Sequence, residues 1–205
     1  MIELTVEEAI ERASALAGAG RALLGIAGCP GAGKSTLSDA ITGSVRSSAV
    51  VPMDGFHMLN EDLVRLGRRD RKGAPDTFDV DAYVALLDRV RRQTSEVITA
   101  PRYDRAASVP IPDAIVVDPH VALVITEGNY LLVDQPPWTA VRPLLDEVWF
   151  VDVEDAVRIP RLIARHIEFG KSPDEAREWV MRSDEANAAL VAATRGRADI
   201  VVRVP

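Results

Sequence analysis

The sequence predicts an α/β protein in which helices cover both faces of a parallel β-sheet. Two observations support this prediction. Short apolar runs alternate along the chain with stretches that carry apolar residues at helical spacing. These runs are apolar throughout, as expected for parallel strands that are buried on both faces. Hydrophobic residues make up 47% of the 205 residues, which is enough for a sizeable core in one domain.

The elements follow one another in a regular order. Residues 5–19 carry apolar side chains at helical spacing, and residues 23–27 form an apolar run closed by glycines. Residues 81–92 are amphipathic, with Tyr83 and Leu87 on the apolar face. By the same criteria we expect helices at 5–19, 35–45, 81–92, 155–168 and 173–193, and strands at 23–27, 49–53, 121–126, 148–153 and 200–203.

Two segments interrupt this alternation. Residues 60–78 are polar and contain the charge run RRDRKG. Residues 97–118 contain extended and β-branched stretches broken by Pro101, Pro110 and Pro112, and we expect a hairpin-like excursion from the sheet there.

Charge and cysteine content exclude several classes of function. The net charge of −7 argues against binding to nucleic acid or to anionic membranes, because both need a basic face. The single cysteine, Cys29, excludes an intrachain disulfide and favours a reducing compartment. The first residues lack the basic and apolar regions of a signal peptide, and no apolar run reaches the roughly 18 residues of a membrane span. We therefore expect a cytoplasmic protein without nucleic-acid or membrane partners.

Residues 28–36 read GCPGAGKST and match the phosphate-binding pattern G-x-x-x-x-G-K-[ST]. Glycines let the backbone wrap around a phosphate, and the following helix adds its positive N-terminal end. Lys34 is placed to reach the β- and γ-phosphates, and Ser35 to bind Mg²⁺. The alternative is a glycine-rich turn with a chance lysine. The predicted nucleotide-binding residues are Gly28, Gly31, Ala32, Gly33, Lys34, Ser35 and Thr36.

Two carboxylates follow predicted strands. Glu127 directly follows the run 121–126. A carboxylate at the carboxyl end of a parallel strand faces the crevice where ligands bind, so Glu127 is a candidate Mg²⁺ ligand. Asp54 directly follows the run 49–53. If that strand neighbours the strand at 23–27, Asp54 lies near the γ-phosphate and suits a general base. The alternatives are an ordinary loop glutamate and an Asp-Gly turn.

Six motifs in order, GCPGAGKST, PMDGFHM, RKGAPDTFD, PRYDR, TEGNYLL and TRGRADIVV, carry a family resemblance. From residue 23 onward the chain resembles the P-loop small-molecule kinases of the phosphoribulokinase, uridine kinase and pantothenate kinase group. Within this group it most resembles bacterial fructose-transport-system or nucleoside kinases. The resemblance implies one three-layer P-loop domain with a five-stranded parallel core, a lid at about 156–171 and a β excursion at about 97–118. It also implies ATP and Mg²⁺ as cofactors.

The resemblance implies roles for further residues. Asp54 is then the catalytic base, and Glu127 binds Mg²⁺ or lines the active site. Arg158, Arg161 and Arg165 share one helix face by their spacing and would clamp ATP phosphates, with Arg161 a catalytic candidate; the alternative is a solvated helix.

On the acceptor side the resemblance points to Tyr103 and Arg105, with His57 as a further candidate. The basic run 68–72 either binds a polar or anionic acceptor or is a solvated loop. Arg195 and Asp199 are candidates for the adenine site.

Together these patterns and the resemblance predict an ATP- and Mg²⁺-dependent kinase that phosphorylates a hydroxyl of a small metabolite, and the resemblance implies a fructose-like sugar or a nucleoside as that metabolite. The alternatives are a pantothenate-like acid kinase and a P-loop ATPase or GTPase switch coupled to a partner. The chain has Tyr-Asp-Arg where pantothenate kinases have Tyr-Ser-His, and it lacks the Asn-Lys-x-Asp motif of GTPases. Relatives in this group often form dimers, and the sequence leaves open whether this chain is a homodimer.

Overall fold

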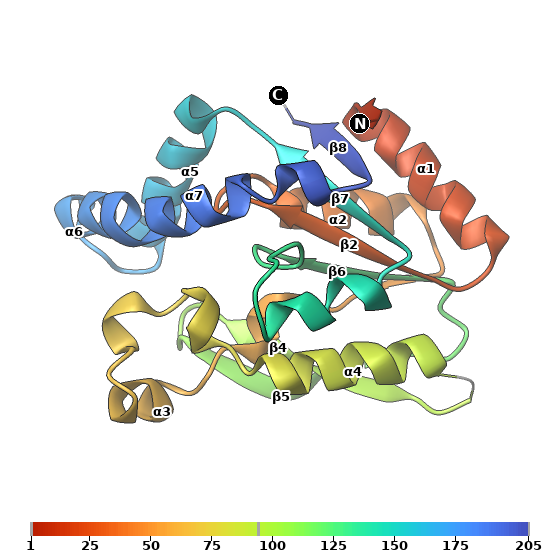
Figure 1. Ribbon diagram of the computed structural model, residues 1–205, viewed down its shortest axis with the longest axis horizontal. Helices are drawn as coiled ribbons and strands as arrows, with labels where there is room; N and C mark the ends of the chain where they lie inside the picture. The colour runs from red at the N-terminus through yellow and green to blue at the C-terminus, as the bar shows by residue number, and fades with distance from the viewer. Residues whose placement is uncertain (1, 94, 205) are drawn as a thin grey trace.

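The computed structural model describes residues 2–93 and 95–204. Its centre is a six-stranded sheet with the strand order β1-β8-β7-β2-β6-β3, and every neighbouring pair is parallel (Figure 1). The strands are β1 (Ile2–Leu4), β2 (Ala22–Gly28), β3 (Ser48–Val50), β6 (Leu123–Gly128), β7 (Glu147–Asp152) and β8 (Ile200–Arg203). The predicted fold class is confirmed.

The sheet has one strand more than the five that were predicted. The five expected apolar runs all form strands, and β2 and β6 are buried along their whole length. The additional strand, β1, pairs with β8 at the edge of the sheet. Its three residues include the exposed Ile2 and Glu3, so β1 has neither the length nor the continuous apolar character of the others.

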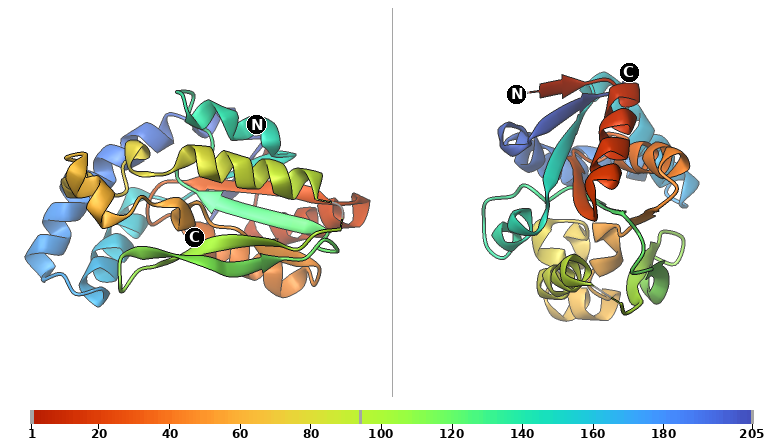
Figure 2. Two further views of the ribbon diagram at one scale, coloured as in Figure 1. Left: turned by 90° about the horizontal axis from the view of Figure 1, so that it is seen from below. Right: turned by 90° about the vertical axis from the view of Figure 1, so that its right-hand side faces the viewer.

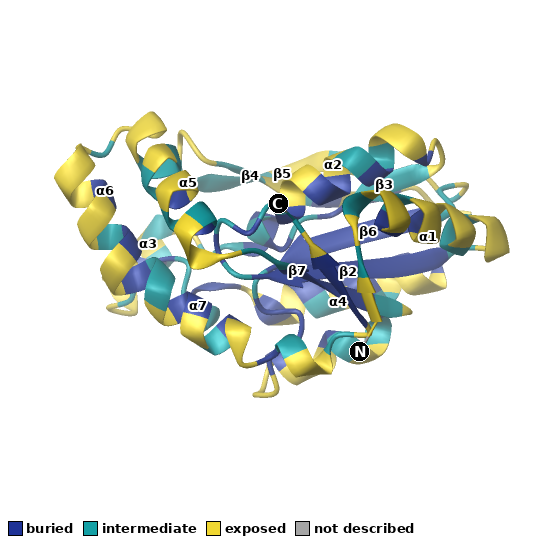
Figure 3. Cartoon of the chain, turned by 90° about the horizontal axis from the view of Figure 1, so that it is seen from above, coloured by how far each residue is buried: buried dark blue, intermediate teal, exposed yellow. Residues whose placement is uncertain are grey.

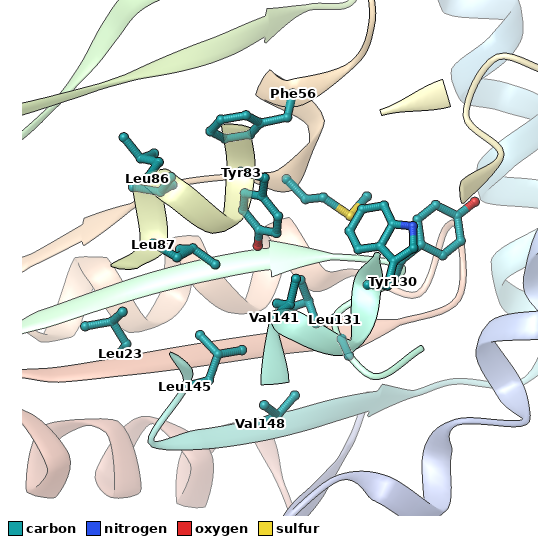
Figure 4. Packing of buried hydrophobic residues seen from close by; sticks show 14 of the residues in the cluster. Leu23, Phe56, Tyr83, Leu86, Leu87, Tyr130, Leu131, Val141, Leu145 and Val148 are labelled. Carbon is teal, nitrogen blue, oxygen red and sulfur yellow. The ribbon is translucent and has the colours of Figure 1, made fainter. Parts of the chain in front are cut away.

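Helices cover both faces of the sheet, as predicted. On one face, α1 (Val6–Ala19) and α2 (Lys34–Ser44) contribute Ala13 and Ile41 to a buried cluster with Ile26 of β2. On the other face, α4 (Val80–Arg92) packs Tyr83 and Leu87 over the sheet (Figure 4). Buried residues accordingly concentrate on the strands, and the outward helix faces are exposed (Figure 3).

The chain after β7 forms helices beyond the carboxyl ends of the central strands, and the last of them runs back along one face of the sheet, where Val191 joins the buried cluster of Phe150 (Figure 1). Helix α5 (Asp155–Glu168) has the predicted bounds and runs through Pro160. The predicted helix at 173–193 divides into α6 (Pro173–Trp179), a π-helical turn (Val180–Asp184) and α7 (Glu185–Ala192). A capping box between Ser172 and Glu175 fixes the start of α6. No helix in the described part of the chain combines the length and apolar character needed to cross a membrane.

The polar segment and the predicted excursion lie outside the sheet. Helix α3 (Asn60–Arg65) begins the polar segment. Strands β4 (Ile98–Asp104) and β5 (Val109–Val117) form a separate antiparallel hairpin (Figure 2).

The hairpin contacts the short 3₁₀ turn Met53–Phe56 that follows β3. A Cβ atom on Gly55 would lie 2.2 Å from the backbone oxygen of Pro101 in β4, so this contact between two backbones requires glycine.

The predicted route to Asp54 needs correction in two respects. The strand is shorter than expected, because β3 ends at Val50 and Met53 already belongs to the 3₁₀ turn. Furthermore, β3 does not neighbour β2, because β6 lies between them. The 3₁₀ turn therefore places Asp54 at the carboxyl ends of the central strands. Its position there does not come from β3 lying next to β2.

Candidate active site

A cavity of about 760 Å³ opens at the carboxyl ends of β2 and β6. Its walls come from the phosphate loop, the 3₁₀ turn, the polar segment, the hairpin tip, the end of β6, α5 and the π-helical turn. Of the predicted site residues it brings together Gly31, Gly33, Lys34, Ser35, Thr36, Asp54, His57, Tyr103, Arg105, Glu127, Arg161 and Arg165. Segments far apart in the sequence thus meet where parallel α/β sheets bind ligands.

The phosphate loop connects β2 to α2 and packs directly beneath α5. Gly31 has a φ of 78°, and a Cβ atom there would lie 2.9 Å from the backbone oxygen of Arg158 and 2.7 Å from Leu162. Glycine at this position therefore satisfies both the left-handed backbone and the close approach of α5. Gly28 and Ala32 do not line the cavity; they belong to the loop's packing against the sheet.

Lys34 is buried within the phosphate loop. Its ammonium donates to the backbone oxygens of Gly28 and Cys29 at 3.0 and 3.1 Å, and to Oδ1 of Asn129 at 2.7 Å. Burial lowers the pKa of Lys34, although the negative charges of Glu127 and Asp54 oppose this shift. These three bonds engage all three hydrogens of the ammonium, so a phosphate oxygen that binds Lys34 replaces at least one of the present partners. Asn129 was missed from the sequence, although it follows Glu127 closely at the end of β6.

Ser35 and Glu127 provide oxygen atoms next to the phosphate loop. The Ser35 hydroxyl donates to Oε1 of Glu127 at 3.0 Å. Burial raises the pKa of Glu127, and the negative charge of Asp54 raises it further. A hydroxyl and a carboxylate are hard ligands that suit Mg²⁺, which takes one or two protein oxygens together with substrate phosphates and water. The described residues contain no cluster of three or more His, Cys, Asp or Glu side chains suited to a metal. The residues present therefore fit Mg²⁺ bound together with a nucleotide.

Asp54 lies between several cations. Nη2 of Arg105, from the hairpin tip, donates to Oδ2 of Asp54 at 2.7 Å. Burial alone raises the pKa of the Asp54 carboxyl, but the charge of Arg105, supported by Lys34 and Arg165, makes the net shift downward. The carboxylate is therefore ionised near neutral pH and can accept a hydrogen bond from a hydroxyl.

Aromatic rings form the wall beside Asp54. The His57 ring, whose Nδ1 lies 2.8 Å from the backbone oxygen of Asp54, stacks on Tyr103 with ring centroids 4.4 Å apart. It also contacts Phe78 at 4.1 Å. Burial lowers the pKa of His57. The predicted acceptor-side residues His57, Tyr103 and Arg105 thus surround the predicted base.

The three arginines of α5 do not share one environment. Arg161 and Arg165 line the cavity, as predicted, and burial lowers the pKa of Arg165. Arg158 is outside the cavity lining and 3% exposed; its guanidinium donates to Asp155 at 2.7 Å and to Glu185 at 2.6 and 2.8 Å. Arg158 therefore links α5 to α7, and it does not lie where it could clamp the phosphates of a nucleotide in the cavity.

Neither predicted adenine residue lines the cavity. Arg195 donates to Asp152 at 3.1 Å and to Glu3 at 3.4 Å. Asp199 accepts from Arg142 and from the backbone nitrogen of Val148 at the start of β7. That end of β7 is opposite to the phosphate loop, so the geometry gives no support to an adenine contact by Asp199.

Known proteins resemble this chain over nearly its whole length. A family model described as the phosphoribulokinase/uridine kinase family matches residues 23–205. A protein of Schizosaccharomyces pombe named as a candidate uridine kinase is 34% identical over 195 residues, which cover 89% of this chain and 83% of the relative.

Two solved structures extend the comparison. A candidate fructose transport system kinase from Silicibacter has 33% identity and a TM-score of 0.87, and the match covers 97% of this chain and 98% of that one. YFH7 of Saccharomyces cerevisiae, described as a candidate P-loop kinase with a circular permutation, has the same fold, with a TM-score of 0.86 at 17% identity over 98% of this chain and 99% of that one.

Proposed function

The chain belongs to the phosphoribulokinase and uridine kinase family, and on that premise we propose that it transfers the γ-phosphoryl group of ATP to a hydroxyl of a small metabolite. For the acceptor we propose a fructose-like sugar or a nucleoside. The observation that carries the proposal is that Lys34, Asp54 and Glu127 come from three separate segments and line one cavity.

Each side chain has a role in this reaction. Lys34 and the loop amides bind the β- and γ-phosphates. Asp54 accepts the proton of the acceptor hydroxyl while that oxygen bonds to the γ-phosphorus and ADP departs. Arg161 and Arg165 stabilise the negative charge of the transferring group. Ser35 and Glu127 would hold Mg²⁺, which would neutralise part of the phosphate charge.

Arg105 has a further consequence for this mechanism. Its guanidinium binds one oxygen of the Asp54 carboxylate. A carboxylate has about four acceptor positions, so an acceptor hydroxyl can bind a remaining one without breaking the ion pair. Arg105 then holds the carboxylate in a fixed orientation toward the hydroxyl.

An ADP-release screen over sugars, nucleosides and pantothenate-like acids tests the proposal. We expect ADP formation that depends on one acceptor class, and loss of that activity in Asp54→Asn. ATP hydrolysis that responds only to a protein partner, and to no small hydroxyl compound, would refute the proposal and favour an ATPase switch.

A further inference from the structure

Lys72 is a buried cation on the cavity wall that the mechanism above does not use. Lys72 is only 9% exposed, and it lines the same cavity as Asp54. Nζ donates to Oδ1 of Asn60 at 2.7 Å and to the backbone oxygen of Ser108 at 2.6 Å. Both partners are neutral, and an ammonium has three hydrogens to donate. One donor position therefore remains.

Lys72 also lacks a countercharge. Among residues 2–93 and 95–204, no carboxylate lies within ion-pair distance of its ammonium. The neighbouring charge that acts on it is another cation, Arg69, which lines the same cavity. The face of the Tyr103 ring compensates this charge only in part. A buried cation without a carboxylate partner is unfavourable for folding, so its position inside a ligand cavity calls for a partner that is negatively charged.

The position of Lys72 separates it from the phosphate loop. Its ammonium lies 5.3 Å from the centroid of the Tyr103 ring, and Tyr103 stacks on His57, the ring beside Asp54. Lys72 is thus on the acceptor side of the predicted base. The phosphates of ATP already have Lys34, Arg161 and Arg165 along the loop and α5. The charge of Lys72 is in excess of what the nucleotide needs.

We propose that Lys72 binds an anionic group of the acceptor, so that the substrate carries a carboxylate or a phosphate in addition to the hydroxyl that is phosphorylated. This inference rests on the kinase function proposed above and narrows its substrate class. In the reaction the acceptor oxygen forms a bond to the γ-phosphorus, and the bond from that phosphorus to the bridging oxygen of ADP breaks. The hydroxyl proton moves to Asp54, and the anionic group at Lys72 is unchanged.

A purely structural role for Lys72 makes a different prediction. Its hydrogen bond to Ser108 connects the polar segment to the hairpin tip, and its bond to Asn60 lies within the polar segment. Lys72 could therefore act only as a clamp between the two. Loss of a clamp lowers thermal stability and impairs all acceptors alike. Loss of an anion-binding group impairs charged acceptors selectively, because a neutral acceptor never used the charge.

The test compares acceptors in neutral and anionic pairs. The pairs are fructose with fructose 1-phosphate and fructose 6-phosphate, glycerol with glycerate, and uridine with uridine 5′-monophosphate. The carboxylate and phosphate members distinguish the two sources of negative charge. Each is assayed by ADP release with the unmodified chain, Lys72→Met, Lys72→Arg and, as the matched control, Arg71→Met. Arg71 belongs to the same basic run but pairs with Asp76 and does not line the cavity.

We expect an anionic member to be the better substrate of its pair. In Lys72→Met its KM rises about 10- to 100-fold with little change in kcat, as for the loss of a charge-assisted hydrogen bond that is made equally before and during reaction. Lys72→Arg recovers most of this loss, and Arg71→Met retains the original KM.

Other outcomes overturn the inference. A neutral member with a kcat/KM equal to or above that of its charged partners would refute it and leave the kinase function standing. An equal KM change for neutral and charged acceptors in Lys72→Met would assign Lys72 to the clamp. If no compound releases ADP, the kinase proposal fails; the anion site is then judged by calorimetric binding of the same pairs to the ADP-loaded protein. Equal binding of neutral and charged members there would refute it as well.

Discussion

Replacing Asp54 by asparagine removes the predicted base while keeping the size of the side chain. The amide cannot accept a proton, so we expect kcat to fall by about 10²- to 10⁴-fold, the usual contribution of a general base. ATP affinity should not fall, because the direct partner of Asp54 is Arg105 and not the phosphate loop. The lost ion pair joins side chains that are 39% and 26% exposed, so the free energy of unfolding should drop by less than about 1 kcal/mol.

The assay combines steady-state ADP release, calorimetric ATP binding and thermal unfolding. A stability loss below about 1 kcal/mol corresponds to a midpoint decrease of less than about 4 °C for a chain of this size. Asp62→Asn is the matched control, because Asp62 forms a carboxylate–arginine pair with Arg65 at 2.8 Å outside the cavity. We expect this control to retain full kcat. An Asp54→Asn protein with near-normal kcat would refute the assignment of the base.

Three further perturbations test other parts of the site. In Lys34→Ala, loss of charge-assisted bonds to phosphate should weaken ATP binding about 10- to 100-fold by calorimetry; unchanged affinity contradicts the role given to the loop. Burial, with the nearby charge of Arg69, lowers the pKa of Lys72 to about 8, so Lys72 is charged below that pH and neutral above it. The KM of a carboxylate acceptor should therefore be constant below pH 8 and rise above it, and a flat profile across pH 7–9.5 contradicts this. In Arg158→Met, loss of the hydrogen bonds to Glu185 should cost about 2–3 kcal/mol and lower the unfolding midpoint by roughly 4–12 °C, and an unchanged midpoint would count against the link between α5 and α7.

The parts of the site that depend on local sequence could be predicted. The phosphate loop is one continuous motif, and its geometry follows from its glycines and from the helix that begins at Lys34. Glu127 could be placed because carboxyl ends of parallel strands meet at one edge of the sheet. The acid at 54 was placed by an incorrect strand order. Asp54 still reaches the site, because its neighbour Met53 packs against Gly128 at the end of β6. A Cβ atom on Gly128 would lie only 2.5 Å from the Cβ of Met53.

The remaining parts depend on distant partners. Helical spacing puts Arg158, Arg161 and Arg165 on one face, but Glu185, 27 positions away from Arg158, decides that only Arg158 is withdrawn from the cavity. The burial of Lys72 likewise depends on Asn60 and on the hairpin tip. No period or spacing in the sequence carries that information.

The contact between Gly55 and Pro101 has a consequence for how this enzyme can change its acceptor. The hairpin contributes a backbone oxygen to that contact, and every amino acid has such an oxygen. The position of the turn that carries Asp54 therefore does not depend on which side chains occupy residues 103–108. Except for Arg105, which pairs directly with Asp54, those positions can diverge or be redesigned while the carboxylate proposed as the base keeps its place. Under the proposed function, the turn that carries the base is thus positioned independently of most of the hairpin tip proposed to bind the acceptor, and Gly55 provides the contact between the two.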